Sequence, residues 1–212
     1  YWRFRMKLLV LLSLAFLLQP AVVAAQNDRL DRHRERLSRL TAEDFAEDIS
    51  IRDDDLEIIA TIDTSEGYRV RGGFFSTERT DNFLRSTINK QTGETHYLLY
   101  QTITYTSLPQ RWRWYERANY QSPNGLSTAR LESVTREVVS CVSRDLCVFR
   151  EDFVLRLTEE AVRWIANHEP GEFWRFRFVA NDGEDWDDIL APAEAAGLLI
   201  AVDNYRSARA LE

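Results

Sequence analysis

The sequence is poor in the residues that interrupt regular structure, and it lacks the repetitive tracts of disordered chains. It contains 8 glycines and 5 prolines among 212 residues, whereas aromatic residues make up 12% of the chain. A chain of this composition can bury a sizeable core, so the body of the protein is expected to fold. No internal repeat or low-complexity linker is present, and the length suits a single domain.

Motifs of common catalytic sites are also lacking. The sequence has no G-x-S-x-G nucleophile elbow, no P-loop and no G-x-G-x-x-G turn. His33, His96 and His168 are scattered, and none lies in an H-E-x-x-H or a triad-like setting. Catalytic groups can converge from distant strands, so an enzyme is not excluded, but neither a reaction nor a cofactor is indicated.

The one long apolar run lies near the N-terminus. Lys7 precedes an apolar stretch from Leu8 to Leu18, and small residues end at Ala25. This pattern predicts a secretory signal over residues 1–25 with cleavage after Ala25, the first five residues being extraneous to the fold. A spanning helix needs about 20 apolar residues, so we expect an exported protein, periplasmic or secreted, without a membrane span after signal removal.

The mature chain is acidic. Removing residues 1–25 takes away Arg3, Arg5 and Lys7, so the formal charge of −7 becomes −10. Phosphate backbones and anionic headgroups are repelled by such a charge unless it is strongly segregated, which argues against a nucleic-acid or membrane-surface partner. An envelope glycan or an envelope protein is the expected partner.

Hydrophobic periodicity predicts an α+β fold dominated by antiparallel sheet, meander or sandwich-like, with two packing helices. Residues 26–48 are charged and helical in character, forming an N-terminal helix or tether ahead of a single β-rich domain over residues 49–212. Period-two patterns separated by turn residues predict strands at 56–62, 68–74, 82–89, 95–106, 112–120 and 172–180. Helices are expected near 159–167 and 192–208.

The two cysteines predict one hairpin disulfide. Cys141 and Cys147 lie between two long strand patterns within residues 128–157. In an exported chain this spacing favours a disulfide, and zinc is disfavoured because two thiolates lack nearby histidine partners. The bond would pin the hairpin and has no catalytic role.

If the two cysteines face each other, the register of the hairpin follows. It places Glu137 opposite Glu151 on the apolar face, between the pairs Val139–Phe149 and Thr135–Phe153. Two carboxylates in a partly dry site can act as general acid and base, as in retaining glycosidases. A bulge that shifts the register, an arginine between the two groups, or a face open to water are the structural alternatives.

Two segments interleave aromatic residues with arginines and are candidate ligand-binding surfaces. Trp112 and Trp114 come from the first, and Arg175 and Arg177 from the second. Aromatic and guanidinium groups together suit sugars or an anionic glycan. In the second segment, however, strand alternation alone accounts for aromatics on one face and arginines on the other.

An acidic segment is a candidate calcium site. The oxygens would come from Asp182, Glu184, Asp185 and Asp187. Calcium needs 6 to 8 oxygen ligands, but the spacing is not that of an EF-hand. A solvated acidic loop explains the same residues.

Taken together, these patterns favour an exported, non-enzymatic binding or envelope-associated module. The competing class is a periplasmic hydrolase of glycans that uses Glu137 and Glu151. A third is a structural protein of envelope assembly, in which the charged segment Asn27–Glu47 docks a partner.

Overall fold

The computed structural model describes residues 34–65, 69–71, 78–107, 111–144 and 146–211. Its helices and strands in chain order are α2 (Ala42–Glu47), β1 (Ser50–Arg52), β2 (Ile59–Asp63), β3 (Arg69–Arg71), β4 (Arg79–Asn89), β5 (Thr95–Ser107), β6 (Tyr115–Ser122), β7 (Gly125–Arg130), β8 (Glu132–Cys141), β9 (Cys147–Leu157), α3 (Glu159–Ala166), β10 (Trp174–Ala180), β11 (Trp186–Leu190) and α4 (Pro192–Ala208). Residues 34–37 are also helical.

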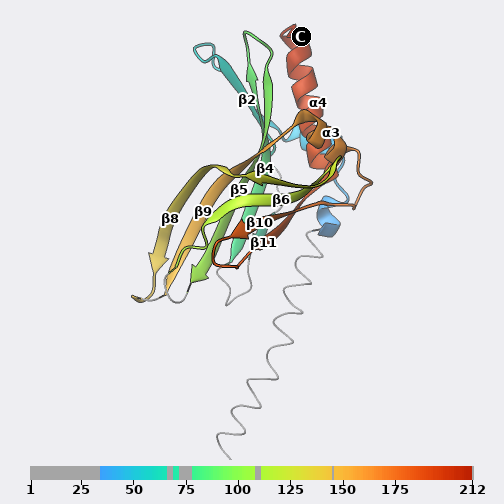
Figure 1. The fold of residues 1–212 in the computed structure, drawn as a ribbon. Helices are drawn as coiled ribbons and strands as arrows, with labels where there is room; N and C mark the ends of the chain where they lie inside the picture. Colours follow the sequence, from blue (N-terminus) through green and yellow to red (C-terminus); the bar gives the residue numbers. More distant parts are fainter. Residues whose placement is uncertain (1–33, 66–68, 72–77, 108–110, 145, 212) are drawn as a thin grey trace, which may run out of the picture.

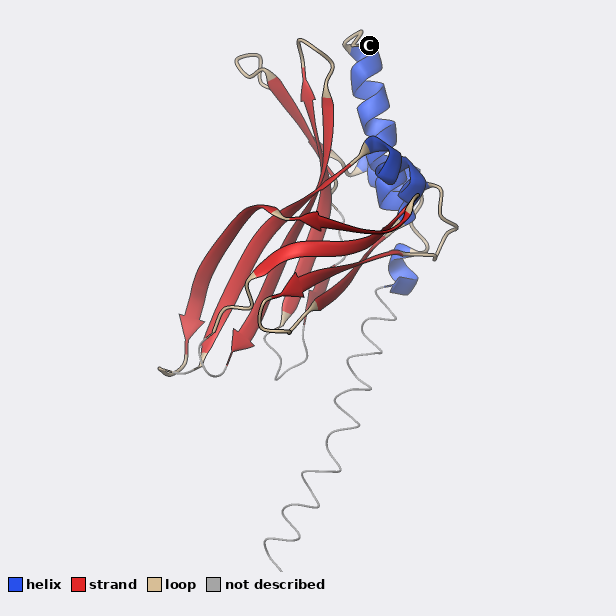
Figure 2. Ribbon diagram, viewed as in Figure 1, coloured by secondary structure: helices blue, strands red, loops and turns tan. Residues whose placement is uncertain are grey.

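The described strands form two antiparallel sheets, which confirms the predicted α+β class. The larger sheet has the order β1-β2-β4-β5-β9-β8, with β3 also paired to β4, and the smaller has the order β11-β10-β6-β7. The smaller sheet lies across part of the larger one, and the helices gather beside the rest (Figure 2). Sandwich-like packing and helix-on-sheet packing are therefore combined in one molecule (Figure 1).

The core lies between the sheets, and the alternation of β4, β5 and β10 directs apolar side chains into it. In β4 and β5 every second side chain is buried. In β10 the apolar residues Trp174, Phe176 and Phe178 point into the core, where Phe153 of β9 contacts Phe178 at 4.6 Å between ring centroids. Since successive side chains of a strand point to opposite faces, Arg175 and Arg177 point outward from the smaller sheet.

The helices begin as their sequences predict. Thr158 caps α3 by accepting a hydrogen bond from the Ala161 N–H at 3.1 Å, and Pro192 occupies the first turn of α4. α4 packs against β2 and β4 of the larger sheet and against α2 and α3. It thus covers the part of the larger sheet beyond the smaller one (Figure 1).

The N-terminal segment differs from the single helix or tether that its charge pattern suggests. Its described part consists of residues 34–37 and the short helix α2, and it packs onto the domain. Leu37 and Phe45 are buried against Ile189 and Ala191 at the end of β11. The predicted signal, with cleavage after Ala25, lies outside the described residues, and among the described residues no helix is long and apolar enough to cross a membrane.

The β8–β9 hairpin carries the predicted disulfide between Cys141 and Cys147, whose Cα atoms are 4.0 Å apart. The register beyond it was predicted wrongly, because β8 shifts between Val138 and Ser140. A bulge of this kind places two residues of one strand opposite one of its partner and moves every later pair. Glu137 therefore lies opposite Arg150 rather than Glu151.

Two described strands, β1 and β11, have no counterpart in the sequence prediction. A third, β7, contains the start of the strand predicted from Thr128, but it pairs with β6 and not within the disulfide hairpin. β11 falls in the segment that resembled an acidic loop, and it is an edge strand paired with β10. β7 pairs with β6 through a tight turn at residues 122–125. Both are edge strands of the smaller sheet, whose outer face is described below.

Candidate functional site

Four arginines project from the outer face of the smaller sheet. They are Arg117 in β6, Arg130 in β7, and Arg175 and Arg177 in β10. Arg117 is directly opposite Arg130, and Arg177 is directly opposite Asn119, so the side chains share one surface. We call this surface, formed by these four residues, the arginine face.

The charges of the arginine face are compensated in part, by Asp187 of β11. Arg177 forms an ion pair with Asp187 of β11, Nε to Oδ1 2.6 Å, and this bond lowers the pKa of the Asp187 carboxyl. Arg175 also interacts electrostatically with Asp187 and contributes to this lowering, whereas Arg117 and Arg130 form no ion pair with any other residue that the structure describes. Like charges directly opposed on a sheet are destabilising, so this arrangement has a cost that an anionic ligand would relieve.

Polar side chains without net charge lie among these arginines. Asn119 and Gln121 of β6 and Thr128 of β7 lie on the same face, and the Thr128 hydroxyl donates to Asn119 Oδ1 at 2.8 Å. A recess of about 260 Å³ lies between β6 and β10, lined on this face by Asn119, Gln121, Arg175, Arg177 and others. Guanidinium donors beside amides and a hydroxyl can bind carboxylates and sugar hydroxyls together.

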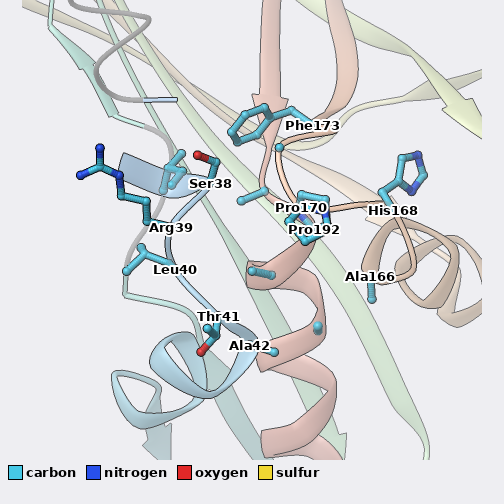
Figure 3. A pocket seen from close by; sticks show the side chains of 15 residues that line it. Ser38, Arg39, Leu40, Thr41, Ala42, Ala166, His168, Pro170, Phe173 and Pro192 are labelled. Carbon is cyan, nitrogen blue, oxygen red and sulfur yellow. The ribbon is translucent and has the colours of Figure 1, made fainter. Parts of the chain in front are cut away.

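A groove continues from the arginine face toward the start of α4. Arg175 also lines an open hollow of about 600 Å³ together with Arg34 and Glu35. This hollow shares Ser38, Gly171 and Phe173 with a pocket of about 330 Å³. The pocket is bounded by residues 37–42, by the loop after α3 and by the first turns of α4 (Figure 3). A volume of this size is within the range of small-molecule sites.

The predicted aromatic candidates Trp112 and Trp114 lie away from the arginine face. Trp112 packs edge-on against Phe149, 4.6 Å between ring centroids, and is part of the core boundary. Trp114 is 44% exposed and has a backbone φ of 57°. The guanidinium of Arg136 lies over its ring, 4.1 Å from the centroid. The structure therefore does not bring these tryptophans together with Arg175 and Arg177.

The carboxylate of Glu151 is buried and surrounded by hydrogen-bond donors of the protein. This carboxylate accepts hydrogen bonds from the Tyr105 hydroxyl at 2.7 Å, the Trp114 N–H at 3.1 Å, the Tyr115 N–H at 3.3 Å and Arg136 Nε at 2.9 Å. Successive backbone N–H groups that point at one anion form a nest. With its acceptor sites engaged by protein donors, Glu151 is arranged to hold β6 against β8 and β9.

Glu137 lies elsewhere on the hairpin. It is exposed and opposite Arg150, so the predicted carboxylate pair does not form. The sequence could not reveal this, because the position of a bulge depends on how β8 packs at the edge of the sheet.

The acidic candidates for calcium are not gathered around one point. Asp182 Oδ1 accepts from the Glu184 N–H at 3.0 Å, Asp185 Oδ1 accepts from the Ala180 N–H at 2.9 Å, and Asp187 pairs with Arg177. Among the residues that the structure describes, no cluster of three metal-ligating side chains is found. The geometry gives the calcium hypothesis no support.

Asp188, the neighbour of these residues, is completely buried and joins the two sheets. Its Oδ2 accepts from the Thr80 hydroxyl at 2.6 Å, from Gln101 Nε2 at 3.0 Å and from Trp186 Nε1 at 3.2 Å, and Oδ1 accepts from the Ile189 N–H at 2.8 Å. Burial raises the pKa of the Asp188 carboxyl to about 6, although these donors oppose the shift. No sequence pattern distinguished Asp188 from its exposed neighbours.

Sequence reasoning found half of the arginine face. Strand alternation in residues 172–180 identified Arg175 and Arg177. Arg117 and Arg130 also fell in predicted strands, but the sequence did not show that these two strands pair with each other. Comparison of the chain with protein families, with curated proteins and with solved structures finds no match. The function is therefore inferred from the geometry of the arginine face alone.

Proposed function

We propose that the protein is an exported binding module that recognises an acidic glycan of the cell envelope through the arginine face. The observation that carries the proposal is the direct opposition of Arg117 and Arg130, neither of which forms an ion pair with another residue that the structure describes. Repulsion between these two guanidinium groups lowers the stability of the sheet. A polyanion that lies across the face would turn the repulsion into binding energy.

Two further observations favour an acidic glycan over other anions. The amides of Asn119 and Gln121 and the hydroxyl of Thr128 provide donors and acceptors for sugar hydroxyls beside the guanidinium groups. The disulfide suits an oxidising compartment, where envelope glycans are found and nucleic acids are scarce. The net charge of the whole chain, −7, also disfavours long-range attraction of nucleic acid.

The hydrolase alternative has no comparable support. Glu151 is buried and hydrogen-bonded, while Glu137 is exposed beside Arg150. An assembly role for the charged N-terminal segment is also less favoured, because Leu37 and Phe45 of that segment are buried against the same domain.

The test is binding of polygalacturonate, a carboxylated polysaccharide, measured by calorimetry at two salt concentrations. We expect the Arg117→Ala/Arg130→Ala variant to bind about tenfold more weakly than the parent protein and to show a smaller salt dependence. Because the variant removes a like-charge pair, its stability should be equal or higher. Arg144→Ala, which removes an exposed arginine in the β8–β9 turn, is the matched control and should bind like the parent.

Neutral dextran and a DNA duplex complete the experiment. Dextran should not bind, since it offers no charge, and DNA should bind more weakly than polygalacturonate. The proposal is overturned if the double variant binds polygalacturonate as tightly as the parent, or if Arg144→Ala weakens binding equally. Tighter binding of DNA would assign the face to nucleic acid instead.

A further inference from the structure

The groove that leads away from the arginine face changes in chemistry along its length. Near β10 its lining includes Arg175 and Arg34 together with Glu35, whose carboxylate pairs with Arg39, and beyond Phe173 it enters the pocket of about 330 Å³ at the start of α4. Apolar side chains form most of the lining of this pocket: Leu37, Leu40, Pro170, Phe173, Pro192 and five alanines. A ligand that follows the groove therefore passes from a charged environment, in which arginines outnumber carboxylates, to an apolar one.

The few polar side chains of the pocket are already engaged within the protein. The Ser38 hydroxyl donates to the Glu35 carbonyl at 2.9 Å, and Thr41 Oγ1 accepts from the Asp44 N–H at 3.2 Å. His168 Nδ1 contacts the Trp164 carbonyl oxygen at 3.0 Å. Arg39 pairs with Glu35, and its guanidinium points away from Phe173 and Pro192 (Figure 3).

This arrangement selects an apolar occupant. Polar groups that are satisfied internally give a polar ligand little to bind, whereas an alkyl group gains free energy by leaving water. The small alanine side chains of α2, α3 and α4 leave room for such a group. Continuity with Arg175 favours an apolar part that is joined to an anion, because the guanidinium lies in the next section of the groove.

We propose that the pocket binds the acyl chain of an acylated acidic saccharide whose acidic sugar lies on the arginine face. This inference rests on the proposed function and narrows its ligand to an anionic glycolipid. The chain enters between residues 38–42 and Pro170 to reach Ala196 of α4, and the acidic head stays beside Arg175.

Decyl glucuronide, below its micellar concentration, is the probe that tests the inference by calorimetry. It should bind about tenfold more tightly than glucuronate, which lacks the chain, and than decyl glucoside, which lacks the charge. Ala196→Phe fills the pocket and should abolish the advantage of the chain while polygalacturonate still binds. Ala208→Phe, at the exposed end of the same helix, should leave both ligands unaffected.

A second variant protects the test against misfolding at Ala196. Ser38 is exposed and lies where the pocket meets the hollow, so Ser38→Trp blocks the passage from the surface and should have the same effect. If both variants bind decyl glucuronide like the parent, or if decyl glucuronide binds no better than glucuronate, the acyl site is refuted while the arginine face stands. Loss of polygalacturonate binding in the arginine variants, by contrast, is required by the proposed function and does not depend on the pocket.

Discussion

At the scale of single residues, the backbone conformation of Trp114 is coupled to the hydrogen bonds of Glu151. A φ of 57° is strained for a large side chain, yet it turns the N–H groups of Trp114 and Tyr115 toward the buried carboxylate. Arg136 completes the arrangement, pairing with Glu151 at 2.9 Å while covering the Trp114 ring. The strained backbone at Trp114 thus contributes two N–H donors to the buried ion pair of Glu151 and Arg136.

Replacing Glu151 by Gln should destabilise the protein strongly. The amide keeps one acceptor but turns its NH₂ group toward donors that the carboxylate satisfied, and it leaves the charge of Arg136 without its partner. Breaking a buried ion pair typically costs about 3–5 kcal/mol. Urea unfolding followed by circular dichroism measures the loss.

Glu137→Gln is the matched control, because Glu137 is exposed on the same hairpin. Its free energy of unfolding should stay within about 0.5 kcal/mol of the parent. Equal effects of the two substitutions would contradict a structural role for Glu151.

Asp188 makes stability depend on pH. Its pKa is raised to about 6 in the folded protein, so the folded state binds the proton more tightly than the unfolded state. The stabilisation is fully present below about pH 4 and is lost as the pH rises through 6. With about two pKa units between the states, the loss is roughly 3 kcal/mol.

Comparison with Asp188→Asn isolates this effect from other titrating groups. The difference in free energy of unfolding between the parent and Asp188→Asn should shift in favour of the variant by roughly 3 kcal/mol between pH 4 and pH 7. A difference that stays constant over this range would show that Asp188 does not titrate there.

At the scale of elements, the strands and helices with strong periodicity were predictable and the bulges were not. The alternation in residues 82–89 and 95–106 predicted β4 and β5, and Thr158 and Pro192 predicted where the helices begin. The hairpin disulfide followed from two cysteines in a turn setting. Local sequence contains these signals, because each depends on neighbours in the chain.

The missed features depend on contacts between distant segments. The shift in β8 between Val138 and Ser140 arises where that strand lies at the edge of the sheet. The strand predicted from Thr128 is interrupted at Leu131, so Thr128–Arg130 belongs to β7 and pairs with β6 in the smaller sheet. Half of the arginine face consequently appears only when the two strands are side by side.

The crossing of α2 and α4 depends on Gly197. A Cβ at this position would lie 2.6 Å from Phe45 Cβ and 2.8 Å from the Ala42 carbonyl oxygen. Alanine ordinarily stabilises a helix by about 1 kcal/mol relative to glycine. Here Gly197→Ala should instead lower the melting temperature, because α2 must move away and Phe45 loses packing.

Ser207→Ala on the exposed side of α4 provides the comparison. It adds a helix-favouring residue without a new contact and should leave the melting temperature equal or slightly higher. A rise in melting temperature for Gly197→Ala would show that the two helices are not held at close approach.

At the scale of the whole molecule, an acidic chain presents one cationic face. The formal charge is −7, yet Arg117, Arg130, Arg175 and Arg177 gather on one side of the smaller sheet with Asp187 as the acidic partner of Arg177. Charge segregated in this way can orient an approaching polyanion toward one surface while the remainder repels it. In the proposed complex, the acidic sugar lies on this face and the acyl chain follows the groove at its edge toward α4.

The most direct measurement is a titration of the ¹⁵N-labelled protein with polygalacturonate, followed by amide chemical shifts. The account predicts shift changes that are concentrated in β6, β7 and β10, around Arg117, Arg130 and Arg175, and that vanish at high salt. Changes centred on the β8–β9 hairpin, or none at a concentration that saturates binding, would contradict it.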